Sequence, residues 1–277
     1  MRITQQDMED YRRHLIEEER ASSTVALYLS AIKRFAAFVQ EEELSKECVL
    51  AYKAQLLEMY APATVNSKIG IINSFLKYMG EPKLCMKRLR IQKQFYLPEE
   101  RQLTCGEYRR LVQTAQQTGN TRMATCLQII CATGIRVSEL RDITVEAAHR
   151  GRAVICNKGK TRTILLPEGL CRRILDYAAQ QKITAGPLIL SSTGKPLDRT
   201  TVWRQMKKLC ETAGIETGKG HPHALRHLFA VTYYRESHDP FALADLLGHS
   251  SVDTTRIYTA GTGAEQMQQL EKLGLML

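Results

Sequence analysis

The sequence predicts a mainly α-helical protein with a small β element, built as an N-terminal helical bundle followed by a larger α+β domain. Three observations support this fold class. Apolar residues recur every three or four positions through the first 79 residues, a Gly-Glu-Pro breaker follows at 80–82, and one pair of β-branched runs interrupts the helical pattern beyond it. Of the 277 residues, 44% are hydrophobic and 25% are charged, as is typical of a globular protein with a buried core.

The first domain is expected to contain four helices. In the second of them Leu27, Ala31 and Phe35 recur at helical spacing, and in the fourth Ile69 and Ile72 do so, which gives each helix an apolar face. Serine and threonine clusters and a proline precede the helical runs and are typical start signals. The expected helices span about residues 4–20, 24–42, 45–60 and 63–79.

A basic stretch places the domain boundary. Residues 61–95 hold seven basic side chains and one acidic side chain, whereas residues 1–60 hold eight basic and eleven acidic ones. Positive charge that follows a chain breaker is typical of a linker or of a surface that contacts a polyanion. We therefore expect one domain over residues 1–95, with the basic linker at its end, and a second over residues 96–277.

The second domain has a mixed pattern. Short runs rich in β-branched residues at 153–156 and 163–166 flank Asn-Lys-Gly-Lys, which predicts a hairpin with its turn at 157–160. Amphipathic stretches predict helices around this hairpin. They span residues 104–117, 121–132, 136–143, 168–181, 199–213, 223–237, 240–247, 251–257 and 263–273.

Composition narrows the class of function. The formal net charge of +10 favours a polyanionic partner such as nucleic acid, although a merely basic surface would have the same charge. No apolar stretch approaches the roughly 20 residues that cross a bilayer, and the N-terminus carries no apolar signal segment. We therefore expect a cytoplasmic protein without a membrane span. The eight cysteines include no CxxC pair, which favours reduced thiols.

Several polar residues stand where helices are expected to begin or end. Arg136 follows a glycine that ends an apolar helix, so it begins the next helix. His223 and Arg226 lie three residues apart and share one helix face. His249 follows a Leu-Gly helix stop, and Tyr258 stands nine residues later. These helix ends could bring the five side chains to one place.

The same residue types suit one reaction. A phosphodiester under attack gathers negative charge on its non-bridging oxygens, and two guanidinium groups can match those oxygens without a metal ion. A lysine on a hairpin can protonate the leaving oxygen, and a histidine can accept the proton of the nucleophile. A tyrosine phenol, with its ordinary pKa near 10, can attack and form a phosphotyrosyl ester. That ester conserves the bond energy, so strands could be rejoined without ATP.

Four motifs resemble, in their order and spacing, those of the tyrosine recombinases, the Xer and phage integrase family. They are Thr-Gly-Ile-Arg-Val-Ser-Glu-Leu at 133–140, His-Ala-Leu-Arg-His at 223–227, Leu-Gly-His at 247–249 and Thr-Thr-Arg-Ile-Tyr at 254–258. Each motif alone is common, and their conjunction within about 125 residues makes the resemblance specific. It covers essentially the whole chain, and it is stronger after residue 98.

The resemblance implies a role for each residue around the phosphate. Arg136 and Arg226 would clamp the scissile phosphate, and His249 would steady it. Glu139 resembles the acidic residue that orients the first arginine in this family. No metal ion or other cofactor is implied.

The resemblance also assigns the proton transfers and the nucleophile. Among the 11 tyrosines it selects Tyr258 as the attacking group, with His223 assisting its proton. Lys158 would be the general acid for the leaving oxygen. Lys160 lies in the same turn and remains the alternative, but the family places this lysine before the glycine of the turn.

The function implied by the resemblance is site-specific DNA recombination through a covalent 3′-phosphotyrosyl intermediate, usually as a tetramer on two DNA sites. The helical bundle would be a SAM-like core-binding domain, and it would form a C-shaped clamp around double-stranded DNA together with the catalytic domain. Two alternatives share the fold or the chemistry. One is a type IB topoisomerase, and the other is a catalytically silent DNA-binding or regulatory protein.

Two surfaces are candidates for contacts with partners. Basic residues on the fourth helix and in the linker are expected to contact DNA phosphates, although each could be only a solvated charge. These residues are Lys68, Lys77, Lys87, Arg88, Arg90 and Lys93. The last segment carries an apolar stripe that could fold back on its own chain or, as the resemblance implies, dock on a neighbouring protomer. The stripe consists of Met267, Leu270, Leu273 and Leu277.

A metal site is the remaining alternative for the histidines. His223 and His227 lie one helical turn apart, and His221 is close in sequence. No carboxylate or cysteine of suitable spacing accompanies them, so we expect no metal site and interpret His221 and His227 as structural residues.

Overall fold

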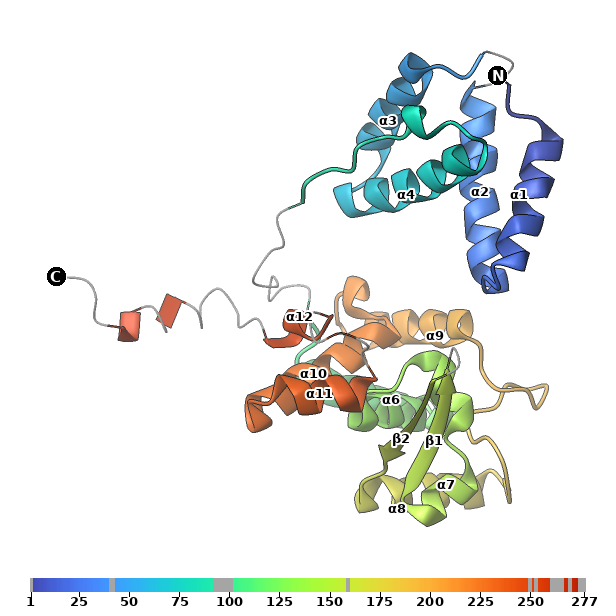
Figure 1. The fold of residues 1–277 in the computed structure, drawn as a ribbon. Helices are drawn as coiled ribbons and strands as arrows, with labels where there is room; N and C mark the ends of the chain where they lie inside the picture. Colours follow the sequence, from blue (N-terminus) through green and yellow to red (C-terminus); the bar gives the residue numbers. More distant parts are fainter. Residues whose placement is uncertain are drawn as a thin grey trace. The chain divides into compact units, whose positions relative to one another are not determined.

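A computed structural model gives the fold of the protein (Figure 1). The chain divides into two compact units, Met1–Lys93 and Gln94–Leu277. The residues that the structure describes are 2–39, 43–91, 102–157, 160–248, 251, 254–259, 267–268 and 271–273, with only the backbone at 157, 160 and 259.

The first unit is a helical bundle, as the sequence predicts. Its described part contains α1 (Gln5–Glu17), α2 (Ser22–Val39), α3 (Lys46–Met59), α4 (Pro62–Tyr78) and the short 3₁₀ helix η1 (Pro82–Leu84). A capping box between Thr4 and Asp7 begins α1. Phe35, Ile69 and Phe75 are fully buried where the helices meet, so the expected apolar faces form most of the core. Leu27, which was expected on the same face as Phe35, is instead 58% exposed.

The chain leaving this bundle is tied to α4 by two asparagines. Asn73 exchanges two hydrogen bonds with the backbone of Met86, with N···O distances of 2.8 Å for both. Asn66, two helical turns earlier, exchanges two with the backbone of Leu89, at 2.9 and 2.7 Å. We call residues 85–90 the exit segment. Because each asparagine side chain replaces a missing backbone partner, the exit segment is held along the helix without forming a helix or a sheet itself.

Two lysines of α3 hold the same stretch from another helix. The Lys46 ammonium donates to the carbonyl oxygens of residues 83–85, and the Lys53 ammonium donates to that of Lys87 at 2.8 Å. Arg88 lies over Gly70 of α4, where a Cβ would come within 2.8 Å of its Nη2. The basic side chains of the exit segment therefore project from a backbone fixed at several points.

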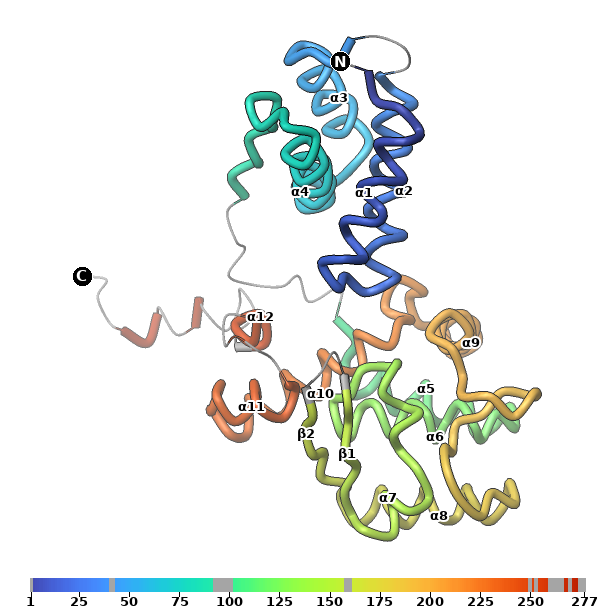
Figure 2. The backbone as a smooth tube through the Cα atoms, turned by 45° about the vertical axis from the view of Figure 1, so that its right-hand side comes forward, coloured from blue at the N-terminus to red at the C-terminus, as the bar shows by residue number. Residues whose placement is uncertain are grey.

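The second unit is mainly helical and carries one two-stranded antiparallel sheet among its described residues (Figures 1 and 2). Strands β1 and β2 pair with Arg152 opposite Leu165 and Asn157 opposite Lys160, which confirms the predicted hairpin. The elements are α5 (Cys105–Gln117), α6 (Thr121–Thr133), η3 (Val137–Asp142), α7 (Val145–Arg150), β1 (Arg152–Asn157), β2 (Lys160–Leu165), α8 (Glu168–Gln180), α9 (Arg199–Thr212), η4 (Thr217–Lys219), α10 (Pro222–Ser237), α11 (Pro240–Leu247) and α12 (Arg256–Thr259).

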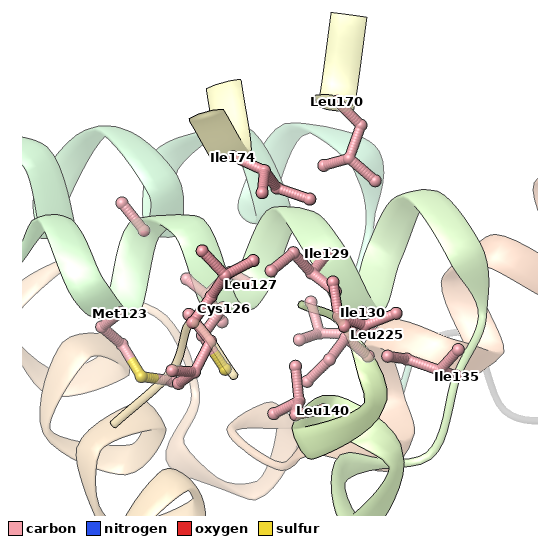
Figure 3. Close-up of a cluster of buried hydrophobic side chains, with 14 of the residues drawn as sticks. Met123, Cys126, Leu127, Ile129, Ile130, Ile135, Leu140, Leu170, Ile174 and Leu225 are labelled. Atoms are coloured by element: carbon pink, nitrogen blue, oxygen red, sulfur yellow. The ribbon is translucent and has the colours of Figure 1, made fainter. Parts of the chain in front are cut away.

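Helix α6 is the centre of this unit. Met123, Cys126, Leu127 and Ile130 of α6 are buried, and α5, α8 and α10 pack around the helix (Figure 3). A smaller buried cluster joins α10 and α11 to Tyr258 of α12. The order and packing of these elements place the ends of α6, α10 and α11 near one another, and the candidate site is built from those ends.

The structure differs from the sequence prediction at three elements. Residues 137–142 form a 3₁₀ helix rather than an α-helix, and the short helix α7 has no counterpart in the prediction because six residues are too few to show periodicity. The expected helix 251–257 is confirmed only at its end: Ser251 and Thr255 are not helical, Thr254 N–H donates to the Ser251 carbonyl, and α12 begins at Arg256. The expected helix 263–273 lies largely outside the described residues.

None of the described helices combines the length and apolar character that a bilayer crossing requires.

Candidate active site

Arg136 stands at a sharp turn between α6 and η3. Gly134 ends α6 with φ of 64°, and a Cβ there would lie 2.3 Å from the ring of Phe229, so both the backbone conformation and the packing require glycine. Arg136 follows in an extended conformation as the residue that caps η3. Its backbone N–H donates to Glu139 Oε2 at 2.8 Å, and its Nη1 donates to Glu139 Oε1 at 3.2 Å. The turn therefore sets the direction of the Arg136 side chain.

Glu139 joins two arginines. Its side chain is 2% exposed, and besides Arg136 it accepts hydrogen bonds from Arg162 Nη1 at 3.1 Å and Nη2 at 2.8 Å. Sequence reasoning did not identify Arg162. The available signal was its place on β2, where it shares a strand face with the buried Ile164, since a basic residue on a buried strand face needs an anionic partner.

Arg226 anchors the site from within α10. It is 2% exposed, and its guanidinium donates to the Gly134 carbonyl at 2.6 Å and to the Leu247 carbonyl at 2.8 Å. Those two carbonyls belong to the ends of α6 and α11, so one side chain ties three helices together. Burial, followed by repulsion from Arg136, lowers the pKa of Arg226 to about 10. The guanidinium therefore remains charged at neutral pH.

His223 lies one helical turn before Arg226, at the start of α10. His221 caps the start of this helix, and its Nδ1 accepts the backbone N–H of Ala224 at 3.1 Å. Burial lowers the pKa of His223 below its ordinary 6.5, and the nearby charges of Arg226, His221 and Arg136 lower it further. A neutral imidazole at this place can accept a proton.

Tyr258 is buried beneath the same helix ends. It is 3% exposed and packs with Ala230, Leu243 and Leu247 of α10 and α11. It lies close enough to Arg226 to affect that guanidinium electrostatically. The nucleophile candidate and the second arginine therefore lie within electrostatic range of each other in one chain.

His227 contacts Tyr258, a neighbour that sequence reasoning missed. The two rings meet edge to face, with centroids 5.2 Å apart and planes at 64°. Burial, followed by His223 and His221, lowers the pKa of His227 to about 4, so this imidazole is neutral at pH 7. No sequence signal pointed to this contact, because His227 and Tyr258 are distant in the chain.

Arg136, His223 and Arg226 line a cleft of about 700 Å³. Arg199 and Trp203 of α9 also contribute to its wall, and the sequence analysis did not single them out. The polar and aromatic residues that line the cleft include Arg136, Arg199, Trp203, His221, His223 and Arg226. Three of the side chains expected at the site thus share one basic hollow, which suits an anionic group.

Two of the expected site residues, Lys158 and His249, lie outside the described residues, and for Lys160 only the backbone is described. The neighbouring backbone is described at both places. Strand β1 ends at Asn157, and Gly248, with φ of 63°, caps the end of α11.

The candidate DNA contacts belong to the first unit. Lys77, Lys87, Arg88 and Arg90 are exposed, whereas Lys68 is half-buried with its ammonium 4.5 Å from the centre of the Tyr60 ring. Lys93 lies outside the described residues. For the metal alternative, no three His, Cys, Asp or Glu side chains within the described ranges are grouped as ligands.

Comparison with known proteins gives concordant matches. Tyrosine recombinase XerA of Pyrococcus furiosus is 27% identical over 281 residues, covering 97% of this chain and 94% of that protein, and tyrosine recombinase XerD of Staphylococcus haemolyticus is 26% identical, covering 91% and 92%. A crystal structure of the lambda integrase bound to DNA has the same fold, with a TM-score of 0.75 and 16% identity over 93% of this chain and 96% of that chain.

The family model described as the phage integrase family matches residues 101–265. This match spans all four motifs singled out from the sequence and takes in the ends of α6, α10 and α11 that hold the arginines. Because it covers more than half of the chain, the protein belongs to the phage integrase family, the tyrosine recombinases.

Proposed function

We propose that this protein is a site-specific DNA recombinase that cuts and rejoins strands by metal-independent transesterification. The single observation that carries this proposal is the cleft that Arg136, His223 and Arg226 line, with the buried Tyr258 within electrostatic range of Arg226. Two fixed guanidinium groups, a neutral imidazole and a phenol are the groups that this reaction requires.

The two arginines stabilise the charge of the reacting phosphate. Arg136 and Arg226 donate to its non-bridging oxygens, which gain negative charge as the nucleophile approaches. Both guanidinium groups are anchored before substrate binds, Arg136 by Glu139 and Arg226 by two carbonyls, so little reorganisation is needed. Preorganised donors of this kind contribute about 3–4 kcal/mol each to lowering a barrier.

The proton transfers follow from the remaining groups. The Tyr258 oxygen bonds to phosphorus while its proton passes to His223, and the bond from phosphorus to the 5′ oxygen breaks. Lys158 gives that oxygen a proton, and His249 steadies the phosphate. The product is a 3′-phosphotyrosyl ester and a free 5′ hydroxyl. A 5′ hydroxyl from another strand reverses the steps and restores a phosphodiester, which requires no ATP and no cofactor.

The assembly follows from the same family. We infer that residues 1–95 form the core-binding domain and residues 96–277 the catalytic domain, and that the two enclose double-stranded DNA. The lambda integrase has been crystallised as a tetramer bound to a Holliday junction, and XerH bound to its difH substrate. We propose a tetramer on two DNA sites, with the C-terminal segment docked on a neighbouring protomer, in the cytoplasm.

The test of this function uses Tyr258→Phe and a nicked suicide duplex. The duplex carries a site selected from random-sequence DNA by binding to the purified protein. The wild type is expected to form a covalent protein–DNA adduct, which denaturing electrophoresis resolves. The variant should bind the same duplex within about twofold and form no adduct, because the phenylalanine ring has no oxygen to attack phosphorus.

Tyr233→Phe is the matched control, because Tyr233 is another tyrosine of the same unit and stacks on Phe229. This variant should retain adduct formation. A wild type that binds but forms no adduct would instead support the catalytically silent alternative. An adduct formed by Tyr258→Phe would show that another residue is the nucleophile.

A further inference from the structure

We propose that Arg162 is a positioning residue of the strand-cleavage site, which holds Glu139 so that Arg136 can face the scissile phosphate. This inference rests on the proposed function, because it assigns a role within that site. Arg162 lies on β2 and is not among the residues that line the cleft. It acts through its neighbours rather than by touching the phosphate.

The first argument is the geometry around Glu139. Arg162 donates to both carboxylate oxygens, at 2.8 and 3.1 Å, in the bidentate arrangement that suits a guanidinium. The side-chain bond from Arg136 is longer, at 3.2 Å, and it uses one nitrogen. Arg162 is therefore the stronger side-chain partner of the buried carboxylate.

The second argument is the division of charge. A buried carboxylate requires a cation, and a single arginine partner would be drawn fully into the pair. The exposed fractions of the side chains differ accordingly, at 17% for Arg162 and 39% for Arg136. Arg162 compensates the negative charge of Glu139. The positive charge of Arg136 is therefore not neutralised by the carboxylate, and its guanidinium can remain at the cleft.

The third argument is the contact of Arg162 with the end of α11. A Cβ at Gly248 would lie 2.7 Å from Cδ and from Nη1 of Arg162, so the arginine crosses directly over this glycine. The preceding residue, Leu247, supplies one of the carbonyls that hold Arg226. Arg162 therefore packs beside the anchors of both proposed phosphate ligands, and this placement assigns it to the site rather than to the hairpin alone.

The test compares Arg162→Gln with the wild type on two suicide duplexes. One carries the normal scissile phosphate, and the other carries a methylphosphonate there, in which an uncharged methyl group replaces one non-bridging oxygen. The second substrate gathers less negative charge and depends less on a positioned cation. Arg136→Gln serves as the reference for a variant that has lost one of the two arginines proposed to bind the scissile phosphate. Arg152→Gln is the matched control, because Arg152 is an exposed arginine of the same hairpin.

On the normal substrate, Arg162→Gln should slow adduct formation about 10- to 100-fold, as is typical when a residue that orients a reactive group is lost, with DNA affinity unchanged within about twofold. On the methylphosphonate, its rate relative to the wild type should recover to within about threefold, in parallel with Arg136→Gln. Arg152→Gln should match the wild type on both. A purely structural defect would not be relieved by the charge of the substrate.

Three results would overturn the inference: an unchanged rate of Arg162→Gln on the normal phosphate, an equal loss on both substrates, or a loss in DNA affinity that accounts for the rate. If Arg162→Gln does not fold, as judged by its melting curve, Arg162→Lys decides between the outcomes. It keeps the charge without the bidentate fork, so it should show a smaller loss with the same recovery. Failure of the wild type to form any adduct would count against the proposed function instead.

Discussion

Arginine has two distinct uses at the candidate site. Arg226 is buried and donates hydrogen bonds to the backbone carbonyls of Gly134 and Leu247. Its position is therefore determined by α10, which carries it, and by the ends of α6 and α11. Arg136 is more exposed and is oriented from one side by Glu139. Lysine could replace neither, because a single ammonium cannot bridge two fixed acceptors and still face a phosphate in a defined plane.

The pH dependence of stability is predicted to depend on His227. Its pKa is about 4 in the folded protein and about 6.5 when unfolded, so folding favours the neutral imidazole. The contribution of His227 to the free energy of unfolding is fully present above pH 6.5. It is lost as pH falls through about 4, and its total is about 3 kcal/mol. Urea unfolding should therefore show a free energy about 2 kcal/mol lower at pH 5 than at pH 7, beyond the change seen in His227→Gln.

The control for this prediction is His149→Gln, since His149 is exposed on α7. That variant should keep the pH dependence of the wild type. If the free energy of unfolding fell equally with pH in the wild type and in His227→Gln, the His227 imidazole would not be the cause of the loss of stability at acidic pH.

At the scale of elements, side chains replace missing backbone pairing where the chain leaves the first unit. Asn66 and Asn73 lie seven residues apart on α4 and bind residues three apart on the exit segment. The match is geometric, because two helical turns advance about 10.5 Å and three extended residues advance about the same distance. Gly70 between the asparagines leaves room for Arg88.

Asn73→Ala is predicted to release part of the exit segment. The buried N–H and carbonyl of Met86 would lose their partner, at a cost of about 1–3 kcal/mol in the free energy of unfolding. Hydrogen exchange should become faster at the amides of Met86 and Leu89. Gln55→Ala, at an exposed position on α3, is the control and should leave both amides protected. Unchanged exchange in Asn73→Ala would contradict the role of the asparagine.

The elements also show how far local pattern predicts structure. The four helices of the first unit and the hairpin were predicted because amphipathic spacing and turn residues are properties of neighbouring positions. Of the helix expected at 251–257, only residues 256 and 257 belong to α12, whose Tyr258 packs against α10 and α11, a contact that no local pattern predicts.

For the whole molecule, the distribution of charge predicts how DNA binding depends on salt concentration. The net charge of +10 is concentrated outside the first sixty residues, and three exposed basic residues, Lys87, Arg88 and Arg90, lie on or beside the tethered backbone of the exit segment. Each phosphate contact releases counterions, so the logarithm of the DNA association constant should fall steeply with the logarithm of salt concentration.

Replacing Lys87, Arg88 and Arg90 together with glutamine should make this salt dependence shallower by about 3 in slope, since each phosphate contact contributes about 0.9. Fluorescence anisotropy across a salt series measures the slope. The control replaces three exposed basic residues of the acidic first sixty positions, Arg12, Arg13 and Lys33, with glutamine. Equal slopes for both triple variants would show that Lys87, Arg88 and Arg90 do not contact DNA phosphates and are only solvated charges.

The sequence alone determined the family, the order of the motifs and most of the helices, because these depend on residue types and on spacing along the chain. It also indicated Arg136, His223, Arg226 and Tyr258 as one site. Only the tertiary structure revealed Arg162 against Glu139 and His227 against Tyr258, pairs that are 23 and 31 positions apart. Such contacts depend on how α10, α11 and β2 pack, and that packing is a sum of many weak apolar contacts which no local pattern encodes.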